Sequence, residues 1–535
     1  MSKRPREDES DIRPAKRARS TSKDTLSRLS DELLLRVLSF LPITDLNICQ
    51  RISHKFKGIA ADSQLWKALY YNRFVRPRAS RLPGIRDADT APGHLYFSSK
   101  LSKWLDDDNL VKRGQETNWK KQYKLRNNWT KGNCNVSEIE VAEQPPIPPL
   151  LVRMHEGIVY TADVTGGLRA WSSKKKEQRM MGSINFGTSS PPTAMALDVG
   201  AGNTGCHHVA IGFEDGAFNV YTFDHEVEKF SEGYSHAASS NGMLSAVAYC
   251  SPYLVTMTAS QLLSLYQFSG SPKAAKILDP PRLLHSLMSH TVYPPLSLAI
   301  RSSSQNIVAT IAFAFPSYLS GWTTGIQELW LAPDGALLDS RLAMSSGSSQ
   351  PAPQLNPAVS PVRTTSPFSA ASVGYSKPTS LSYSHPYLLL SHSDNTLTLY
   401  LVTSSDKVLS IGAGSRLWGH TSSVSGAHVG GRGKAVSVSS RGDELRIWEL
   451  EGTNRRKLAS SDLSVRVQGE NFPSTTSVKR LSSALARKGS GLGLEVRDME
   501  DLSVVRGWVG FDEENVVVLK ERGAGSQSLV VYDFT

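Results

Sequence analysis

The sequence predicts a multidomain chain in which a short all-α module precedes a large all-β region built from seven repeats. Apolar residues recur at helical spacing between residues 26 and 71, and one strand pattern recurs seven times after residue 134. The length of 535 residues leaves room for about two to four domains. A hydrophobic fraction of 39% and ten tryptophans favour substantial folded cores.

The module near the N-terminus is predicted to contain three short amphipathic helices. The first carries Leu33, Leu34, Val37, Leu38 and Leu41 at helical spacing. Ser30 is placed to cap it and Pro42 to end it, Thr44 can cap a second helix that reaches Ile59, and a third begins near Ser63. A unit of about 45 residues has a marginal core, and this one has neither a cysteine pair nor a metal motif. The sequence therefore predicts a protein partner.

This module, residues 24–75, resembles an F-box in Leu29-Ser30-Asp31-Glu32-Leu33, Leu38-Ser39-Phe40-Leu41-Pro42, Asp45-Leu46 and Leu65-Trp66. The resemblance implies docking on a Skp-type adaptor, and through it on cullin and RING subunits. The implied adaptor-binding residues are Leu29, Ser30, Leu33, Leu38, Leu41, Pro42, Leu46 and Trp66. Ser30 stands where the family usually has proline, which predicts a weaker apolar contact. The alternative is a helical hairpin packed on its own chain.

The net charge of +11 is concentrated at the N-terminal end. Residues 1–133 hold 28 Lys+Arg against 15 Asp+Glu, which leaves 32 against 34 for the remainder. Residues 1–23 are expected to be a disordered basic tail. Its clusters, formed by Lys3, Arg4, Lys16, Arg17 and Arg19, resemble a bipartite nuclear localisation signal. This predicts an import receptor as a partner and a location in the nucleus, the cytoplasm or both; the alternative is a solvated tail.

Residues 76–133 are predicted to form a helical linker. Leu101, Trp104 and Leu105 indicate one helix, and Trp119 and Tyr123 lie one helical turn apart on another. The run Trp119-x-x-x-Tyr123, followed by Asn128-Trp129-x-x-Gly132, resembles the spacer between an F-box and a WD-repeat propeller. Such a spacer holds two modules at a fixed distance.

The repeats each end in a strand with a terminal aromatic residue: Trp171, Tyr221, Tyr266, Trp330, Tyr400, Trp448 and Tyr532. They resemble degenerate WD repeats, and the fullest copy runs from Gly419-His420 to Ile447-Trp448. Asp215 and Asp394 are placed to cap tight turns through backbone amides. Asp443 lies five residues before Trp448 where the family expects six, so the buried His–Asp network of this repeat is doubtful.

Residues 134–535 therefore predict a seven-bladed WD-repeat-like β-propeller. The last repeat lacks an outer strand, which Val136 to Val141 can supply, and this pairing removes an exposed sheet edge. The spacing of the repeats exceeds the roughly 40–45 residues of a blade. The excess is assigned to disordered insertions at about 340–378 and 472–492, which are rich in serine.

Motifs for catalysis, cofactors and membranes are not found. The sequence has no nucleophile elbow, phosphate-binding loop, zinc-protease motif or dinucleotide fingerprint, and no apolar run reaches the roughly 18 residues of a spanning helix. Four scattered cysteines fit a reducing compartment. Cys206-His207-His208 lacks spaced partners, so neither a metal nor a cofactor is expected. The sequence predicts a non-enzymatic protein.

The resemblance implies the substrate-recognition subunit of an SCF-type ubiquitin ligase, with the propeller binding a client protein. In this family the residue before the tight-turn aspartate faces the ligand, which selects Glu214, Thr323, Ser393 and Arg441 as candidate client contacts, together with Val164 and Ala259. A lone arginine does not indicate a highly phosphorylated ligand. The alternative is a nuclear propeller scaffold or an RNA-associated protein. Because the basic charge is regional, nucleic-acid binding by the whole protein is disfavoured.

Overall fold

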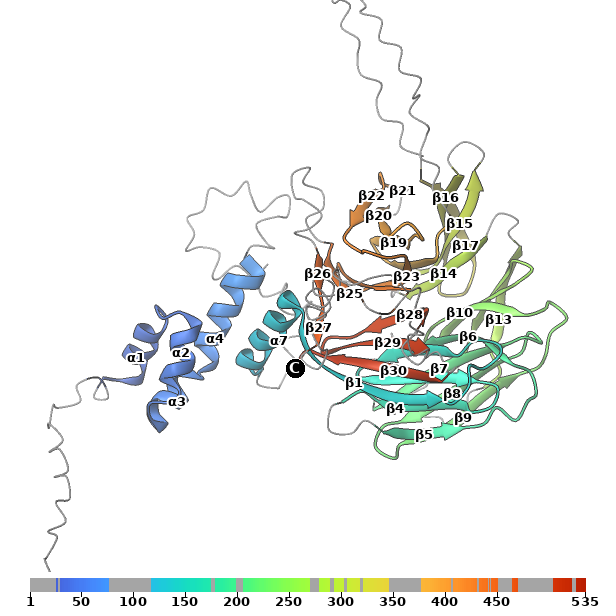
Figure 1. Cartoon of the computed structure of the whole chain (residues 1–535). Coiled ribbons are helices and arrows are strands. Elements are labelled where there is room, and N and C mark those ends of the chain that lie inside the picture. Colours follow the sequence, from blue (N-terminus) through green and yellow to red (C-terminus); the bar gives the residue numbers. More distant parts are fainter. Residues whose placement is uncertain are drawn as a thin grey trace, which may run out of the picture. The chain divides into compact units, whose positions relative to one another are not determined.

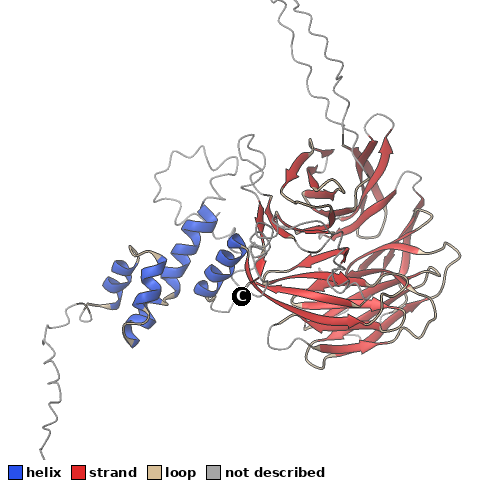
Figure 2. Cartoon of the chain, in the orientation of Figure 1, coloured by secondary structure: helices blue, strands red, loops and turns tan. Residues whose placement is uncertain are grey.

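The computed structural model describes residues 26, 29–76, 117–174, 179–198, 205–269, 279–288, 293–302, 306–317, 321–345, 377–405, 408–430, 433–440, 442, 444–450, 464–469, 504–521 and 526–535. The chain divides into two compact units, Met1–Tyr123 and Lys124–Thr535. Helices dominate the first unit and strands the second (Figures 1 and 2). None of the described helices is both long and apolar enough to span a bilayer.

Among the described residues 29–76 there are four helices, where the sequence predicted three. They are α1 (Asp31–Leu38), α2 (Ile43–Cys49), α3 (His54–Ala60) and α4 (Ser63–Tyr70), and α4 continues into a π-helical turn, η1 (Tyr71–Val75). The predicted second helix is split because Ser53 caps a new one, its hydroxyl accepting a hydrogen bond from the Phe56 amide at 3.2 Å.

Two predicted helix caps are wrong. Ser30 precedes α1 in an extended conformation, but its side chain makes no capping hydrogen bond to the backbone. Thr44 lies inside α2, which begins one residue earlier behind Pro42, and its hydroxyl donates to the Asp45 carboxylate instead. Proline can begin a helix because the first amide groups have no partner within the helix.

The core of this unit is formed by one face of each helix. Leu34 and Leu38, four residues apart on α1, are buried with Leu46, Phe56, Ile59 and Leu65. A second cluster contains Trp66, Tyr70, Tyr71 and Val75, together with Trp119 and Tyr123 from the start of α7 (Trp119–Lys131). The prediction that Trp119 and Tyr123 share a helix is confirmed, whereas Leu101, Trp104 and Leu105 lie outside the described residues.

The C-terminal unit is a propeller of seven sheets, as the repeats predicted (Figure 1). Blade 1 contains β2 (Leu151–His155), β3 (Ile158–Asp163), β4 (Gly167–Ser172) and β5 (Met180–Ile184). Blade 2 contains β6 (Pro192–Leu197), β7 (Cys206–Phe213), β8 (Phe218–Asp224) and β9 (Lys229–His236). Blade 3 contains β10 (Leu244–Cys250), β11 (Tyr253–Thr258), β12 (Leu262–Gln267) and β13 (Arg282–Met288).

Blade 4 contains β14 (Tyr293–Ser302), β15 (Ile307–Ser317), β16 (Gly321–Leu331) and β17 (Leu337–Met344). Blade 5 contains β18 (Ser380–Ser384), β19 (Tyr387–Ser391) and β20 (Thr396–Ser404), with β21 (Leu409–Ile411) and β22 (Ser415–Trp418) both paired to β20. Blade 6 contains β23 (Val424–Val429), β24 (Lys434–Ser439), β25 (Leu445–Glu449) and β26 (Ser464–Arg466). Each of the seven repeated aromatic residues lies on the third strand of its blade, as predicted.

The last blade is completed by the first strand of the unit. Blade 7 contains β28 (Val504–Phe511), β29 (Asn515–Glu521) and β30 (Gln527–Asp533), and its outer strand is β1 (Asn133–Ala142), which also pairs with β27 (Gln468–Gly469). Strands β1 and β30 are antiparallel, with Val136 opposite Tyr532 and Ile139 opposite Leu529. The predicted closure is confirmed. Nearby, Trp129 of α7 stacks on Phe534 at 4.3 Å between ring centroids.

The buried polar network of blade 6 is present, with glutamate in place of aspartate. His420 Nε2 lies 2.5 Å from the Ser437 hydroxyl, which also accepts a hydrogen bond from the Trp448 indole at 2.7 Å. Glu444 Oε2 lies 3.5 Å from His420 Nδ1. Burial works to raise the pKa of Glu444, but hydrogen bonds from the Thr421 amide and Arg446 lower it overall. Asp443, the residue that caused the doubt, lies outside the described residues.

Candidate functional site

The N-terminal unit exposes large apolar side chains on its first two helices and the turns after them. Leu33, Val37, Phe40, Ile48 and Ile52, which we call the apolar docking set, have exposed fractions between 48% and 73%. Leu33 and Val37 are four residues apart on α1 and so lie on one side of that helix, whereas Ile48 is near the end of α2 and Ile52 lies in the turn after it. Such exposed apolar residues mark protein-binding surfaces when they are grouped.

The candidate adaptor-binding residues divide between this surface and the core. Leu33, Ser30 and Pro42 are exposed, and Leu29 and Leu41 are half-buried. Leu38, Leu46 and Trp66 are at most 2% exposed and pack inside the helical unit, and their assignment as contact residues stays a prediction. The Trp66 indole also donates to the Ala60 carbonyl at 2.8 Å. Their role is to hold the helices together.

Val37, Phe40, Ile48 and Ile52 were not among the candidates. The signal was present in the sequence: α1 has two apolar rows, one through Leu34 and Leu38 and one through Leu33 and Val37. A single helix cannot bury both rows against the same neighbours. A basic side chain accompanies the exposed row, since the Arg36 guanidinium lies 5.0 Å from the centre of the Phe40 ring.

The candidate client contacts lie at one end of the propeller sheets. In each antiparallel blade, the turn between the second and third strands lies at the end opposite the turns between the first and second and between the third and fourth. Glu214 and Ser393 are exposed in second-to-third turns of blades 2 and 5. Thr323 is half-buried near the start of β16, opposite Phe315, at the same end of blade 4. Arg441 lies outside the described residues.

Aspartates hold several of these turns. The Asp215 carboxylate accepts the Ala217 amide at 3.0 Å, as predicted. Asp394 differs from the prediction, because it accepts the Thr396 hydroxyl at 2.6 Å and pairs with Arg416. Asp163 in blade 1 was missed; it accepts the Thr165 amide at 2.9 Å and pairs with Arg169. The bonds of Asp163 and Asp215 fix the backbone of their turns, whereas those of Asp394 join side chains.

Comparisons with known proteins agree with both units. The family described as F-box protein pof12 beta-propeller matches residues 134–535, and the F-box-like family matches residues 26–72. The chain is 23% identical over 446 residues to F-box protein pof12 of Schizosaccharomyces pombe. The aligned region covers 82% of this chain and 88% of that protein.

Two other relatives match shorter parts. F-box protein dre-1 of Caenorhabditis elegans is 42% identical over 84 residues, covering 16% of this chain and 8% of that protein. F-box/WD repeat-containing protein 8 of Mus musculus is 26% identical over 147 residues, covering 28% of this chain and 20% of that protein. Since the propeller family spans more than half of the chain and the structure contains its seven blades, the chain belongs to the F-box protein pof12 beta-propeller family.

Proposed function

We propose that this chain is the substrate-recognition subunit of an SCF-type ubiquitin ligase. In this role the helical unit binds a Skp-type adaptor, which brings cullin and RING subunits, and the propeller binds a client protein for ubiquitination and proteasomal degradation. The apolar docking set on a unit that matches the F-box-like family carries the proposal.

Burial energetics support a protein partner for the helical unit. Full burial of a Leu, Ile, Val or Phe side chain contributes about 1.5–3 kcal/mol. The five residues of the apolar docking set are each roughly half exposed or more. A partner that covers them therefore gains a large favourable free energy of apolar burial. A membrane surface is a less suitable partner. Helices that bind membrane surfaces are usually longer, whereas α1 and α2, which carry part of the apolar docking set, have only eight and seven residues.

The proposed role requires no covalent chemistry from this chain. A receptor that holds a client lysine beside a charged conjugating enzyme raises the effective concentration of the two reactants. The second-to-third turns of the propeller are suited to client binding because Glu214 and Ser393 are exposed there, beside Asp215, which binds a backbone amide, and Asp394, which pairs with Arg416.

Adaptor binding is tested by capturing the full chain with its partners. The paired change Phe40→Ser with Ile48→Ser removes two exposed side chains of the docking set and should lower recovery of adaptor and cullin at least about tenfold. The matched control is Val227→Ser, which removes an exposed apolar side chain from the propeller and should leave recovery unchanged. Equal recovery with and without the docking pair would remove the ligase proposal and favour a scaffold role. Leu38→Asp is unsuitable, because Leu38 is 2% exposed and the change would unfold the helices.

Client binding is tested in the background of the docking pair, where clients should accumulate because they are not degraded. Proteins captured by that variant should be lost when Glu214→Lys is added, because the change reverses a charge at the proposed contact face. Glu226→Lys, at the opposite end of the same blade, is the control. Loss with both changes, or with neither, contradicts the assignment of the client face.

Nuclear location is part of the proposal and rests on the basic tail alone. A fluorescent fusion of the full chain should concentrate in the nucleus, and replacing Lys16, Arg17 and Arg19 by alanine should shift it towards the cytoplasm. An unchanged distribution after this replacement would show that the cluster is only a solvated tail.

A further inference from the structure

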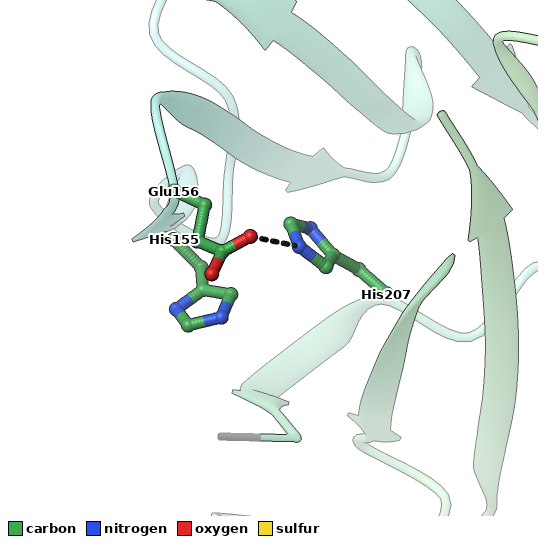
Figure 3. A group of neighbouring side chains, drawn as sticks. All are labelled: His155, Glu156 and His207. Atoms are coloured by element: carbon green, nitrogen blue, oxygen red, sulfur yellow. Dashed lines mark ion pairs between the residues drawn. The ribbon is translucent and has the colours of Figure 1, made fainter. Parts of the chain in front are cut away.

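Two histidines and a glutamate converge between blades 1 and 2 (Figure 3). His155 is the last residue of β2, Glu156 follows it in the turn to β3, and His207 is the second residue of β7. One nitrogen or oxygen atom from each of the three side chains lies within 4.8 Å of the other two. This group lies at the end of the sheets opposite the candidate client contacts.

The His207 ring is held in place by a buried tyrosine. His207 is 8% exposed, and its Nδ1 lies 2.7 Å from the hydroxyl of Tyr160, which is fully buried. Nε2 therefore remains the ring nitrogen directed at Glu156, whose Oε2 lies 3.6 Å away (Figure 3). A histidine whose far nitrogen is held by a hydrogen bond is the usual arrangement of a metal-binding histidine.

A third imidazole adjoins the group. His225 follows β8, and its ring centre lies 4.0 Å from that of His207 at an interplanar angle of 87°. Its Nε2 is buried and has no hydrogen-bond partner among the described residues. Burial lowers the pKa of His207 to about 3, and the neighbouring His225 and His155 add to the effect. The pKa of His225 is also lowered, chiefly by burial.

The turn that carries Glu156 has a defined geometry. Glu156 and Gly157 have φ angles of 47° and 79°, both in the left-handed region, so the two form a tight hairpin turn. The Gly157 carbonyl accepts hydrogen bonds from the Ser173 amide at 3.0 Å and the Ser173 hydroxyl at 2.7 Å. Asparagine or glycine is favoured at the first of these positions, and glutamate is not. Glu156 thus occupies a backbone conformation that glutamate rarely adopts.

We propose that His155, Glu156 and His207 bind a Zn²⁺ ion, with His225 as a fourth ligand, and that the ion links the first turn of blade 1 to blade 2. Imidazole and carboxylate ligands in this number suit zinc, whereas Mg²⁺ and Ca²⁺ prefer oxygen ligands alone. Zinc at about 2.0–2.2 Å from each ligand needs donor atoms roughly 3.4 Å apart. The 3.6 Å between Glu156 Oε2 and His207 Nε2 is already close to this spacing, whereas donor atoms up to 4.8 Å apart must move closer when the ion binds. The proposal departs from the expectation of no metal drawn from the sequence, and it does not depend on the proposed ligase role.

The test uses the full chain carrying an affinity tag that contains neither histidine nor cysteine. Stripped protein is titrated with Zn²⁺ against a coloured chelator, and with Co²⁺, whose visible absorption reports a tetrahedral site. The expected result is one high-affinity ion per chain. Because His207 is buried and its replacement can unfold the blade, the informative variants are His155→Gln and Glu156→Gln. Each should weaken Zn²⁺ binding about 10- to 100-fold.

The matched control is His285→Gln, which removes a half-buried histidine from β13 in blade 3 and should leave Zn²⁺ affinity unchanged. An excess of Mg²⁺ should not displace the Zn²⁺. The proposal is overturned if the full chain binds no Zn²⁺ at micromolar concentration. It is equally overturned if the His155 and Glu156 variants bind as well as the unaltered protein, or if His285→Gln has the same effect as they do.

Discussion

The two units of this chain treat apolar side chains in opposite ways. The helical unit buries Leu34 and Leu38 but leaves Leu33 and Val37 of the same helix about half exposed. The propeller buries the aromatic side chain of Trp448 completely and closes its ring by pairing β1 with β30. The difference supports the proposal that the helical unit, and not the propeller fold, uses its exposed apolar side chains to bind a partner.

Size and topology explain the contrast. A few short helices enclose only one apolar row each, because a unit of about 45 residues has too little interior for both. Seven sheets packed around an axis bury both faces of their inner strands, and β1 covers the outer edge of β30 in blade 7. Apolar residues that remain exposed in the helical unit are therefore more informative about binding than scattered ones in the propeller.

The largest expected effect compares two tryptophans of the propeller. Trp448→Ala should lower the free energy of unfolding by about 3–5 kcal/mol, because it opens a cavity and leaves the Ser437 hydroxyl without one hydrogen bond. Trp418→Ala, at a side chain that is 54% exposed, should change it by less than about 0.5 kcal/mol. Urea unfolding followed by fluorescence and circular dichroism measures both. Similar losses for the two variants would contradict the assigned burial.

A comparison of adjacent leucines applies the same logic to the helical unit. Leu34→Ala should cost about 2–4 kcal/mol, enough to expose the amides of residues 31–70 to hydrogen exchange. Leu33→Ala, one residue earlier, should leave that exchange unchanged while it weakens adaptor binding. If Leu33→Ala unfolds the helices as well, the exposed row has a structural role and the proposed difference between the units is wrong.

A pH effect is expected in the propeller at Asp512, whose pKa burial raises to about 6 from an ordinary 3.8. Between about pH 4 and pH 6 the folded state holds a proton that the unfolded state has lost, so stability falls as the pH rises through this window. Asp512→Asn should reduce the change in the free energy of unfolding across this window by roughly 1 kcal/mol. The full pKa shift would give a larger value, but the side chain is only half-buried and solvent screens it. The amide oxygen can still accept the Glu514 and Asn515 amides. Parallel pH profiles for the two proteins would contradict the shift.

The smallest expected effect concerns Ser30. Its φ of −63° is compatible with proline, and its side chain makes no capping bond to the backbone. Ser30→Pro should therefore stabilise α1 by roughly 0.5 kcal/mol and should strengthen adaptor binding. Thermal unfolding and adaptor titration of the same variant measure the two effects. Weaker or unchanged adaptor binding would contradict the prediction that serine at this position lowers the affinity for the adaptor.

Much of the fold followed from local patterns in the sequence. The seven terminal aromatics identified the third strand of every blade, and Val136 to Val141 identified the strand that closes the ring. These predictions succeeded because strand periodicity and repeat spacing are properties of the chain itself. The sequence analysis did not predict the split of the second helix. Ser53 caps α3, but whether the chain ends one helix and starts another there depends on tertiary packing.

Sequence alone thus determined that this protein has a helical module, seven blades and a closing strand. Tertiary structure decided which leucines face inward, since Leu33 and Leu34 are equally apolar and differ only in what packs against them. It also brought Glu444 beside His420, and placed His155 and Glu156 next to His207. Residues some fifty positions apart meet because neighbouring blades repeat the same path, and no local pattern in the chain records which side chains then face each other.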